Sequence, residues 1–356
     1  MAQKKTVPNQ NKRVLVALSG GVDSAVSAAL LKDQGYTVEA GHMVCWDEGP
    51  YCSADADRAS AAKVAAHLDI PFHVFDFRKE YRQEVIGYFY SEYEEGRTPN
   101  PDVACNREIK FGIFLQKALS LGYDYIATGH YARVEKVGDR YKLLAGVDPN
   151  KDQSYFLYNL NQEQLAHSLF PVGALLKTQV REIAEKYKLP NSAKKDSQGI
   201  CFIGDVEISE FLREKIKPRF GEVVNPSGEV LGKHQGVAFY TIGQREGLGI
   251  SKKVPHYVVA KQIKTNTIVA APFNDESHFQ KSLSGEKVNW VSSIPLEGEE
   301  VSVRSRYRQD LLSARIVEAE EKSLKLAFSE PQRGITSGQS VVLYKGEEVL
   351  GGGTII

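Results

Sequence analysis

The first apolar segment of the chain, Val14 to Leu18, contains no polar residue. A parallel strand that is buried on both faces has this continuous pattern, whereas a strand with one face in water alternates. Ser19-Gly20-Gly21 follows directly. After it, apolar residues recur at helical spacing, at Val22, Val26, Ala29 and Leu30. The pattern therefore predicts a buried strand, a glycine turn and a helix that begins at the turn.

The same alternation of strand and helix continues downstream. Gly35 is placed to end the first helix, and Thr37–Val44 is typical of a second strand. Residues 55–68 repeat apolar positions at helical spacing, and Phe72–Phe77 predicts a third strand. Parallel strands with helical connections form a doubly wound sheet, whose ligands bind at the carboxyl ends of the strands. We therefore expect an α/β fold with its site at those ends.

Two prolines interrupt the chain after a helix predicted at residues 78–95. Pro99 and Pro101 bracket Asn100, and each proline restricts its own φ and the residue before it. We expect a stiff loop over Gly96–Asp102 that presents Asn100 and Asp102 in a set geometry.

A helix is predicted after that loop, with Cys105 in its first turn. Its apolar face contains Phe111, Phe114, Leu115 and Ala118. The helix dipole favours thiolate over thiol in a first turn, which would make Cys105 reactive. The alternative is that Cys105 is a small buried hydrophobic residue, the commoner fate of a free cysteine.

The next part of the chain predicts short strands and a second cysteine in a loop. Expected strands are Tyr125–Thr128, Tyr141–Leu144 and Tyr155–Leu157, followed by a helix at about 178–187. Cys201 lies beside Gly199 in a polar segment, which suggests exposure and mobility. It is a second candidate reactive thiol, whereas Cys45 and Cys52 have no such setting.

The pattern changes beyond residue 207. A helix at Ile208–Lys215 precedes glycine-punctuated strands, with a turn at Asn225–Gly228 and a glycine-rich connection at Tyr240–Gly249. From residue 282, short alternating strands predict a small β-barrel. We therefore expect three domains, a catalytic one at 1–207, a central one at 208–281 and a barrel at 282–356.

Composition narrows the classes of function. The chain of 356 residues has 45 Lys+Arg and 45 Asp+Glu, so its net charge is zero and RNA contact must come from local basic clusters. One such cluster is Arg304, Arg306 and Arg308, which alternation would place on one strand face beside Tyr307. A solvated edge strand is the alternative explanation for these charges.

Cysteine spacing and apolar runs exclude other classes. Four cysteines without Cys-x-x-Cys spacing predict neither a disulfide framework nor a metal site. No segment reaches transmembrane length, and residues 1–13 lack the apolar part of a signal peptide. We expect a cytoplasmic protein.

The glycine turn is a predicted anion site, because a helix N-terminus offers free backbone N–H groups and a favourable dipole. It lacks the Gly-Lys-Ser/Thr of a Walker A loop and the Gly-x-Gly-x-x-Gly of a dinucleotide fold. Ser19-Gly20-Gly21-Val22-Asp23-Ser24 resembles the PP-loop of the ATP pyrophosphatases, which split ATP between its α and β phosphates. The resemblance implies an adenine nucleotide α-hydrolase-like sheet with ATP and Mg²⁺ at the loop and no permanently bound cofactor. The expected ATP contacts are Ala17, Leu18, Ser19, Gly20, Gly21, Val22, Asp23 and Ser24, with Met43 and Gly129 at neighbouring strand ends.

Nearly the whole chain resembles the tRNA-specific 2-thiouridylase family. The motifs that carry the resemblance occur in order: Ala17–Ser24, Thr98-Pro99-Asn100-Pro101-Asp102 with Cys105-Asn106, Thr128-Gly129-His130-Tyr131, Lys151-Asp152-Gln153-Ser154, Gly199–Gly204 and Thr241–Arg245. The family adenylates the C2 oxygen of the wobble uridine in tRNA and replaces that oxygen with sulfur, releasing AMP and pyrophosphate.

The resemblance also implies roles for individual residues. Cys201 would carry the sulfur as a persulfide, Cys105 would release it by forming a disulfide with Cys201, and Asp102 would be the general acid/base. Asn100, Pro101 and Asp102 would contact the target base. The expected contacts with tRNA are His130, Lys151, Asp152, Gln153, Arg306, Tyr307 and Gln339. The implied partners are the anticodon region of tRNA and a sulfur donor, either a cysteine desulfurase or a relay protein.

Two other functions fit parts of the sequence. Another PP-loop ligase, such as an amide synthetase, uses a nitrogen nucleophile and needs no pair of cysteines. A non-catalytic RNA-binding protein would need neither an intact Asp23 nor two thiols. Formation of thiolated tRNA and pyrophosphate from ATP, sulfide and unmodified tRNA would separate the three.

Overall fold

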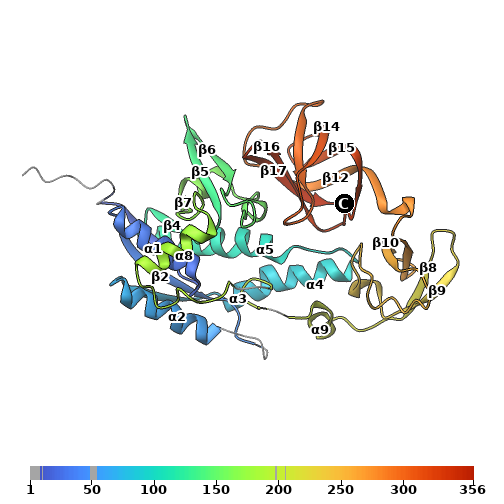
Figure 1. Cartoon of the computed structure of the whole chain (residues 1–356), viewed down its shortest axis with the longest axis horizontal. Helices are drawn as coiled ribbons and strands as arrows, with labels where there is room; N and C mark the ends of the chain where they lie inside the picture. Colours follow the sequence, from blue (N-terminus) through green and yellow to red (C-terminus); the bar gives the residue numbers. More distant parts are fainter. Residues whose placement is uncertain (1–8, 10, 49–53, 197–198, 205) are drawn as a thin grey trace, which may run out of the picture. The chain divides into compact units, whose positions relative to one another are not determined.

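The computed structural model describes residues 9, 11–48, 54–196, 199–204 and 206–356. The chain forms two compact units (Figure 1). The first unit consists of Met1–Val85, Pro101–Asp205 and Glu347–Val349, and the second of Ile86–Asn100, Val206–Gly346 and Leu350–Ile356.

A five-stranded parallel sheet with strand order β3-β2-β1-β4-β7 is the centre of the first unit. Its strands are β1 (Arg13–Ala17), β2 (Thr37–Val44), β3 (Phe72–Asp76), β4 (Tyr125–Ala127) and β7 (Ser168–Leu169). The chain winds outward from β1 through β2 to β3 and then returns to the other side of β1 at β4. The predicted doubly wound sheet is therefore confirmed, and its switch point lies between β1 and β4.

Helices cover both faces of this sheet. On one face, α1 (Val22–Asp33), α2 (Ala54–His67) and α8 (Lys177–Lys186) share a buried apolar core with β1 and β2, and α1 lies beside α8 (Figure 1). On the other face, Gly41 of β2 approaches the ring of Phe114 so closely that a side chain at Gly41 would displace it. The remaining short elements of this unit are α3 (Arg78–Tyr81), η1 (Arg82–Ile86, a π-helix), α7 (Gln162–Ala166), β5 (Ala132–Val137) and β6 (Arg140–Ala145).

The helix that leads to β4 changes its hydrogen-bond spacing along its length. It begins as α5 (Pro101–Ala104), widens into the π-helix η2 (Cys105–Phe114) and ends as α6 (Leu115–Ser120). Proline is favourable at the first helical position because its missing N–H has no acceptor there. Two expectations are therefore wrong: Asp102 belongs to the first helical turn, not to the loop, and Cys105 lies one turn further in.

The predicted strand at Tyr155–Leu157 is also wrong. This segment forms the 3₁₀ turn η3 (Ser154–Phe156), in which all residues are buried. Asp152 Oδ1 accepts hydrogen bonds from the backbone N–H groups of Ser154 and Gly146, both at 3.0 Å. An aspartate that binds the backbone N–H two residues on starts a turn, and here that local bond outweighs the strand preference of the aromatic residues.

The second unit contains a small mixed sheet with strand order β10-β11-β8-β9. The elements of this part are α4 (Gly87–Glu94), α9 (Ile208–Arg213), β8 (Gly221–Val224), β9 (Val230–His234), η4 (Val237–Phe239), β10 (His256–Gln262), β11 (Thr267–Pro272) and η5 (Glu276–His278). Strands β8 and β9 are joined at the predicted turn, where Gly228 donates to Asn225 at 2.9 Å and has φ +89°.

A closed β-barrel makes up the rest of the second unit. Its strands are β12 (Phe279–Trp290), β13 (Glu300–Arg304), β14 (Leu312–Ala319), β15 (Ser323–Arg333), β16 (Ser340–Lys345) and β17 (Glu348–Ile355), and pairing of β12 with β17 closes it around an apolar core. The predicted barrel is confirmed.

The predicted arginine face of the barrel is not a strand face. Strand β13 ends at Arg304, and Gln309 Oε1 accepts from both the backbone N–H and the hydroxyl of Ser305 at 2.9 Å. This turn places Arg308 at φ +61°, so Arg306 and Arg308 do not continue the alternation of β13.

Candidate active site

The predicted phosphate loop lies between β1 and α1, at the carboxyl edge of the sheet. Gly21 is the N-cap of α1, and Ser24 Oγ in the first turn donates to the Gly21 carbonyl at 3.1 Å. Ser19 donates its backbone N–H to Ser24 Oγ at 3.3 Å. The two serines thus close the loop upon itself, and the first N–H groups of α1 remain available to an anion.

Three side chains from outside the loop hold the Gly20 carbonyl. Ser60 Oγ donates to it at 2.9 Å, Asn191 Nδ2 at 3.0 Å and Lys194 Nζ at 3.2 Å. Gly20 has φ +82°, and a Cβ there would clash with the Asp57 carbonyl. Only glycine fits this position, and the loop is fixed from outside.

Asp23 lies in a network of charged and hydroxyl groups. Lys177 Nζ donates to its two carboxylate oxygens at 2.7 and 2.9 Å, and Tyr131 Oη donates to Oδ1 at 2.8 Å. Lys177 also pairs with Asp196 at 2.7 Å, and Lys151 and Arg181 pair with the same aspartate at 2.7 and 2.8 Å. Burial opposes ionisation of Asp196, but Lys151 and Lys177 outweigh it and lower its pKa to about 2. Lys177 therefore places a cation beside the loop, where a polyphosphate would lie.

The structure brings Gly129, predicted to contact ATP, to this loop. A Cβ at Gly129 would lie 2.7 Å from the backbone nitrogen of Ser24, so only glycine allows this close approach. Met43, near the end of β2, is 7% exposed. Both residues flank the strand end from which the loop departs, and their contact with adenine stays a prediction.

The two candidate thiols meet in the first unit. Cys105 Sγ lies 3.6 Å from Cys201 Sγ, although 96 residues separate them in the sequence. Neither forms a disulfide. Since a disulfide requires about 2.05 Å between the sulfur atoms, a movement of about 1.5 Å would join them.

Two hydrogen bonds to side chains fix the backbone of Cys201. Its N–H donates to Asp102 Oδ1 at 3.0 Å, and its carbonyl accepts from Tyr81 Oη at 2.6 Å. The turn around it is closed by a bridge between Ile200 and Gly204. Cys201 is partly buried, in a tight turn held against α5 and α3.

The surroundings shift the pKa values of the two thiols in opposite directions. Burial, and then the neighbouring Cys201 sulfur, raises the pKa of Cys105 well above its ordinary value. The hydrogen bond from Cys105, and then the charge of Lys110, lowers the pKa of Cys201 to about 7. The expectation that the helix dipole makes Cys105 a thiolate is therefore wrong, because full burial and the distance from the helix start remove that effect. Cys201 is the more acidic thiol of the pair.

Asp102 lies beside the thiol pair, and the structure describes a third cysteine, Cys45. Burial raises the pKa of Asp102, while the Cys201 N–H opposes that shift. Cys45 is buried, and burial raises its pKa well above the ordinary value. Cys52 lies outside the described residues.

Asn100 directly precedes α5 and Pro101 is its first residue, so the three residues predicted to contact the base are contiguous with the thiol site.

Several residues predicted to contact tRNA have protein partners in the first unit. His130 is buried, and its Nδ1 lies 2.8 Å from Thr128 Oγ1. Lys151 pairs with Asp196, Asp152 is buried with the turn bonds given above, and Gln153 Oε1 accepts from the backbone N–H of Tyr131 at 3.0 Å. Their contact with tRNA stays a prediction.

The predicted tRNA residues of the second unit are similarly engaged. Arg306 donates to the Ile242 carbonyl at 3.1 Å and to Thr336 Oγ1 at 2.9 Å. Gln339 Nε2 donates to the carbonyls of Thr98 and Pro99 at 2.9 and 3.2 Å. Tyr307 lies 5.3 Å from the guanidinium of Arg308 and is partly buried.

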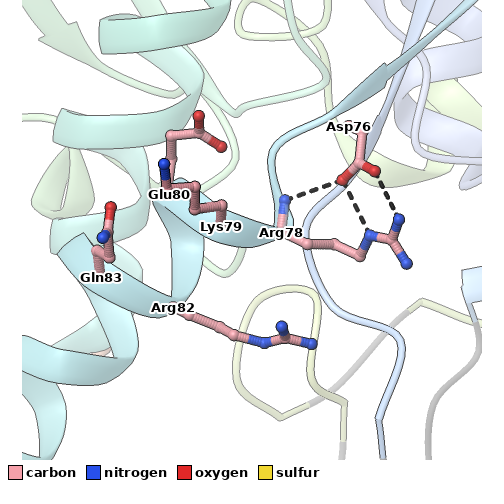
Figure 2. Close-up of a pocket in the computed structure, with 6 residues that line it drawn as sticks. All are labelled: Asp76, Arg78, Lys79, Glu80, Arg82 and Gln83. Carbon is pink, nitrogen blue, oxygen red and sulfur yellow. Dashed lines mark hydrogen bonds and ion pairs between the residues drawn. The ribbon is translucent and has the colours of Figure 1, made fainter.

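A pocket of about 600 Å³ lies at the carboxyl end of β3 and is lined by Asp76, Arg78, Lys79, Glu80, Arg82 and Gln83 (Figure 2). Its arginines are already paired: Arg78 with Asp76 at 2.6 Å and with Asp47, and Arg82 with Glu48 at 2.6 Å. None of the lining residues is a predicted site residue. We assign no role to this cavity.

Sequence reasoning missed Lys177, Lys110 and the role of Tyr131. Tyr131 belongs to a recognised motif, but only the structure shows its contact with Asp23. In the described part of the chain no group of three or more His, Cys, Asp or Glu residues could hold a metal ion. Nor does that part include a helix with the length and apolar character needed to cross a bilayer.

Three family models match consecutive parts of the chain. The tRNA methyl transferase HUP domain matches residues 12–205, the tRNA methyl transferase PRC-barrel domain residues 209–272 and the aminomethyltransferase beta-barrel domain residues 280–355. These matches follow the α/β region, the small mixed sheet and the barrel in order.

Curated relatives match the chain over nearly its whole length. The tRNA-specific 2-thiouridylase MnmA of Nitrosomonas europaea is 48% identical over 354 residues, covering 97% of this chain and 98% of that protein. The proteins of the same name from Listeria monocytogenes and Bacillus subtilis are 47% and 44% identical, covering 98% and 97% of this chain and 95% of each relative. This chain belongs to the tRNA-specific 2-thiouridylase family.

Proposed function

We propose that this chain replaces the C2 oxygen of the wobble uridine in tRNA with sulfur, using Mg²⁺–ATP as a substrate and Cys105 and Cys201 as the sulfur-handling pair. The observation that carries the proposal is the 3.6 Å separation of these two sulfur atoms. A ligase that transfers nitrogen has no use for two thiols in contact.

The first half of the reaction activates the uridine. The carbonyl oxygen of uridine is a poor leaving group, and AMP attached to it is a good one. The loop at Ser19–Ser24 holds the pyrophosphate part of ATP, with the N-terminus of α1 and the cation Lys177 facing the negative charge. Asp23 orients the Mg²⁺-bound triphosphate, and pyrophosphate leaves as the uridine O2 bonds to the α-phosphorus.

The second half transfers sulfur from a persulfide on Cys201. The outer sulfur bonds to C2, and the bond from C2 to the AMP oxygen breaks. Cys105 then attacks the inner sulfur, Cys201 Sγ, so that the Sγ–Sγ bond forms and the persulfide S–S bond breaks. The uridine leaves with C2=S, and the enzyme is left with a disulfide that a thiol reductant must open before the next turnover.

Asp102 is the proton acceptor in this scheme. The Cys105 thiol loses a proton as it attacks the inner sulfur. Burial raises the pKa of Asp102, so its carboxylate binds a proton more readily than an exposed aspartate does. Its contact with the Cys201 N–H places it beside the reacting sulfur atoms.

The remaining parts of the proposal concern partners. A persulfide-bearing protein, either a cysteine desulfurase or a relay protein, loads Cys201 in the cytoplasm. The anticodon region of tRNA binds mainly through phosphates, to Lys151 and Gln153 in the first unit and to Arg306, Tyr307 and Gln339 in the second. The basic residues Arg245, Lys252 and Lys253 line a hollow of about 440 Å³ in the second unit and fit the same use.

The experiment is a two-step assay with a ³⁵S-labelled persulfide donor. Cys201→Ser should fail to accept the label, while Cys105→Ser should accept it and fail to form 2-thiouridine with ATP and tRNA. Cys45→Ala is the matched control, because it removes a buried thiol of the same unit that has no part in the scheme, and it should retain both steps.

Two results would contradict the proposal. Label found on Cys105 after replacement of Cys201 would reverse the roles of the two cysteines. Full thiolation with either cysteine replaced would leave free sulfide as the nucleophile and remove the persulfide pathway.

A further inference from the structure

Lys110 lies beside the thiol pair, and the proposed reaction assigns it no role. It belongs to η2 and is partly buried. Its ammonium group is 5.9 Å from the ring of Phe202, the residue that follows Cys201. Its positive charge acts on Cys201, Cys105 and Asp102.

The groups around the Cys201 sulfur come from four elements, and only one of those described is a cation. Cys105 and Lys110 come from η2, Asp102 from α5, Tyr81 from α3, and Cys45 follows β2. The thiols, the phenol and the carboxyl group are neutral or negative in every protonation state. A negative charge on Cys201 is therefore opposed by burial and by Asp102 and is favoured by the Cys105 thiol and by Lys110.

The π-helix explains how one helix supplies both Cys105 and Lys110. In an α-helix of 3.6 residues per turn, residues five apart point about 140° away from each other. A π-helix joins residues five apart by its hydrogen bonds and so brings them to one side. Cys105 is the first residue of η2 and Lys110 is the sixth, so the wide turn directs thiol and ammonium toward the same loop.

We infer that Lys110 is the counter-ion that keeps the Cys201 sulfur ionised, both when it accepts sulfur and when it carries it. The inference rests on the proposed function of Cys201. In loading, the Cys201 thiolate attacks the outer sulfur of a donor persulfide R–S–SH. The new S–S bond forms, the donor S–S bond breaks, and the donor leaves as R–S⁻, which takes up the proton of the new Cys201–S–SH and leaves Cys201 as the persulfide anion, so charge and atoms balance. The ammonium lies where the thiolate, and then the persulfide anion, carries its charge.

The acidities of the groups fit this arrangement. Burial disfavours the charge on Lys110. The negative charges of Cys201, Cys105 and Asp102 outweigh burial, and together they raise the pKa of Lys110 above its ordinary value. The ammonium therefore stays charged at any pH at which the enzyme works. Cys201, with its pKa at about 7, then exists in part as thiolate at neutral pH.

The test is the pH dependence of Cys201 alkylation by iodoacetamide, read from the Cys201 peptide by mass spectrometry in the full-length protein. The wild-type rate should have its midpoint near pH 7. Lys110→Met should raise the midpoint to 8 or above, which slows alkylation at pH 7 at least about fivefold. Lys110→Arg should restore the midpoint, because it keeps the charge. Lys142→Met, which removes another partly buried lysine of the first unit, should leave it unchanged.

Thermal unfolding of each variant separates a local effect from loss of the fold, because unfolding would expose Cys45 and Cys105 to alkylation as well. An unchanged midpoint in folded Lys110→Met overturns the inference and leaves the proposed function intact. Thiolation that persists in Cys201→Ser overturns the proposed function, whatever the midpoint does.

Discussion

Lys177→Met removes the cation that bridges Asp23 and Asp196 in the absence of nucleotide. The Lys177 side chain is 14% exposed, and those of Asp23 and Asp196 are 29% and 32% exposed, so water screens these pairs only in part. After the substitution Asp23 keeps the hydroxyl of Tyr131, and Asp196 keeps Lys151 and Arg181. We therefore expect the free energy of unfolding to fall by only about 1–2 kcal/mol.

The effect on ATP should be larger than the effect on stability. A charge-assisted hydrogen bond to phosphate contributes about 1.5–3 kcal/mol, and its loss weakens binding about 10- to 150-fold. In addition, Asp23 without its lysine presents a less compensated negative charge to the incoming triphosphate. Both effects weaken binding of the nucleotide.

The assay is titration calorimetry with Mg²⁺ and a non-hydrolysable ATP analogue, in the absence of tRNA. Lys151→Met is the matched control, since it removes a different cation from Asp196 without touching Asp23. It should change the Kd for the analogue by less than about threefold. If Lys177→Met binds the analogue as tightly as this control does, Lys177 is a structural residue and the reasoning is refuted.

Two further predictions concern acid stability and tRNA. The lowered pKa of Asp196 stabilises the fold above about pH 4, and this contribution is lost as the pH falls toward 2. Asp196→Asn should therefore lower the free energy of unfolding by about 1–2 kcal/mol at pH 6 but not at pH 2. Urea unfolding across this pH range measures the difference. Arg306→Ala should weaken tRNA binding uniformly across sequences and reduce the slope of log K against log salt by roughly one phosphate contact; an unchanged slope in a filter-binding titration would exclude Arg306 from the tRNA surface.

The parts of the fold that depend on local pattern were predictable. Strand β1, the glycine loop and α1 were expected within a residue or two, because burial, turn chemistry and helix start all lie in one short segment. The prediction of a strand at Tyr155–Leu157 was wrong because the same aromatic residues fit a buried strand and a buried turn equally well. A single aspartate, Asp152, decides between the two.

The chemistry of the thiol site was only half predictable. The identity of Cys105 and Cys201 followed from their motifs, but their contact depends on how a loop folds against a helix far away in sequence. Lys110 could not be found, because α-helical spacing turns it away from Cys105 and nothing in the residues of η2 indicates a π-helix. The acidity order of the two thiols likewise depends on burial, which the sequence does not show.

The three hydrogen bonds to the Gly20 carbonyl have a consequence for the synthesis of the protein. Its donors lie 40, 171 and 174 residues further along the chain. During synthesis the Ser19–Ser24 segment therefore leaves the ribosome long before two of the three donors have been translated. A nascent chain that ends before Asn191 contains the whole motif and Ser60 but lacks the other two contacts, so we expect the capacity to capture ATP to arise late in translation, when the first unit is nearly complete.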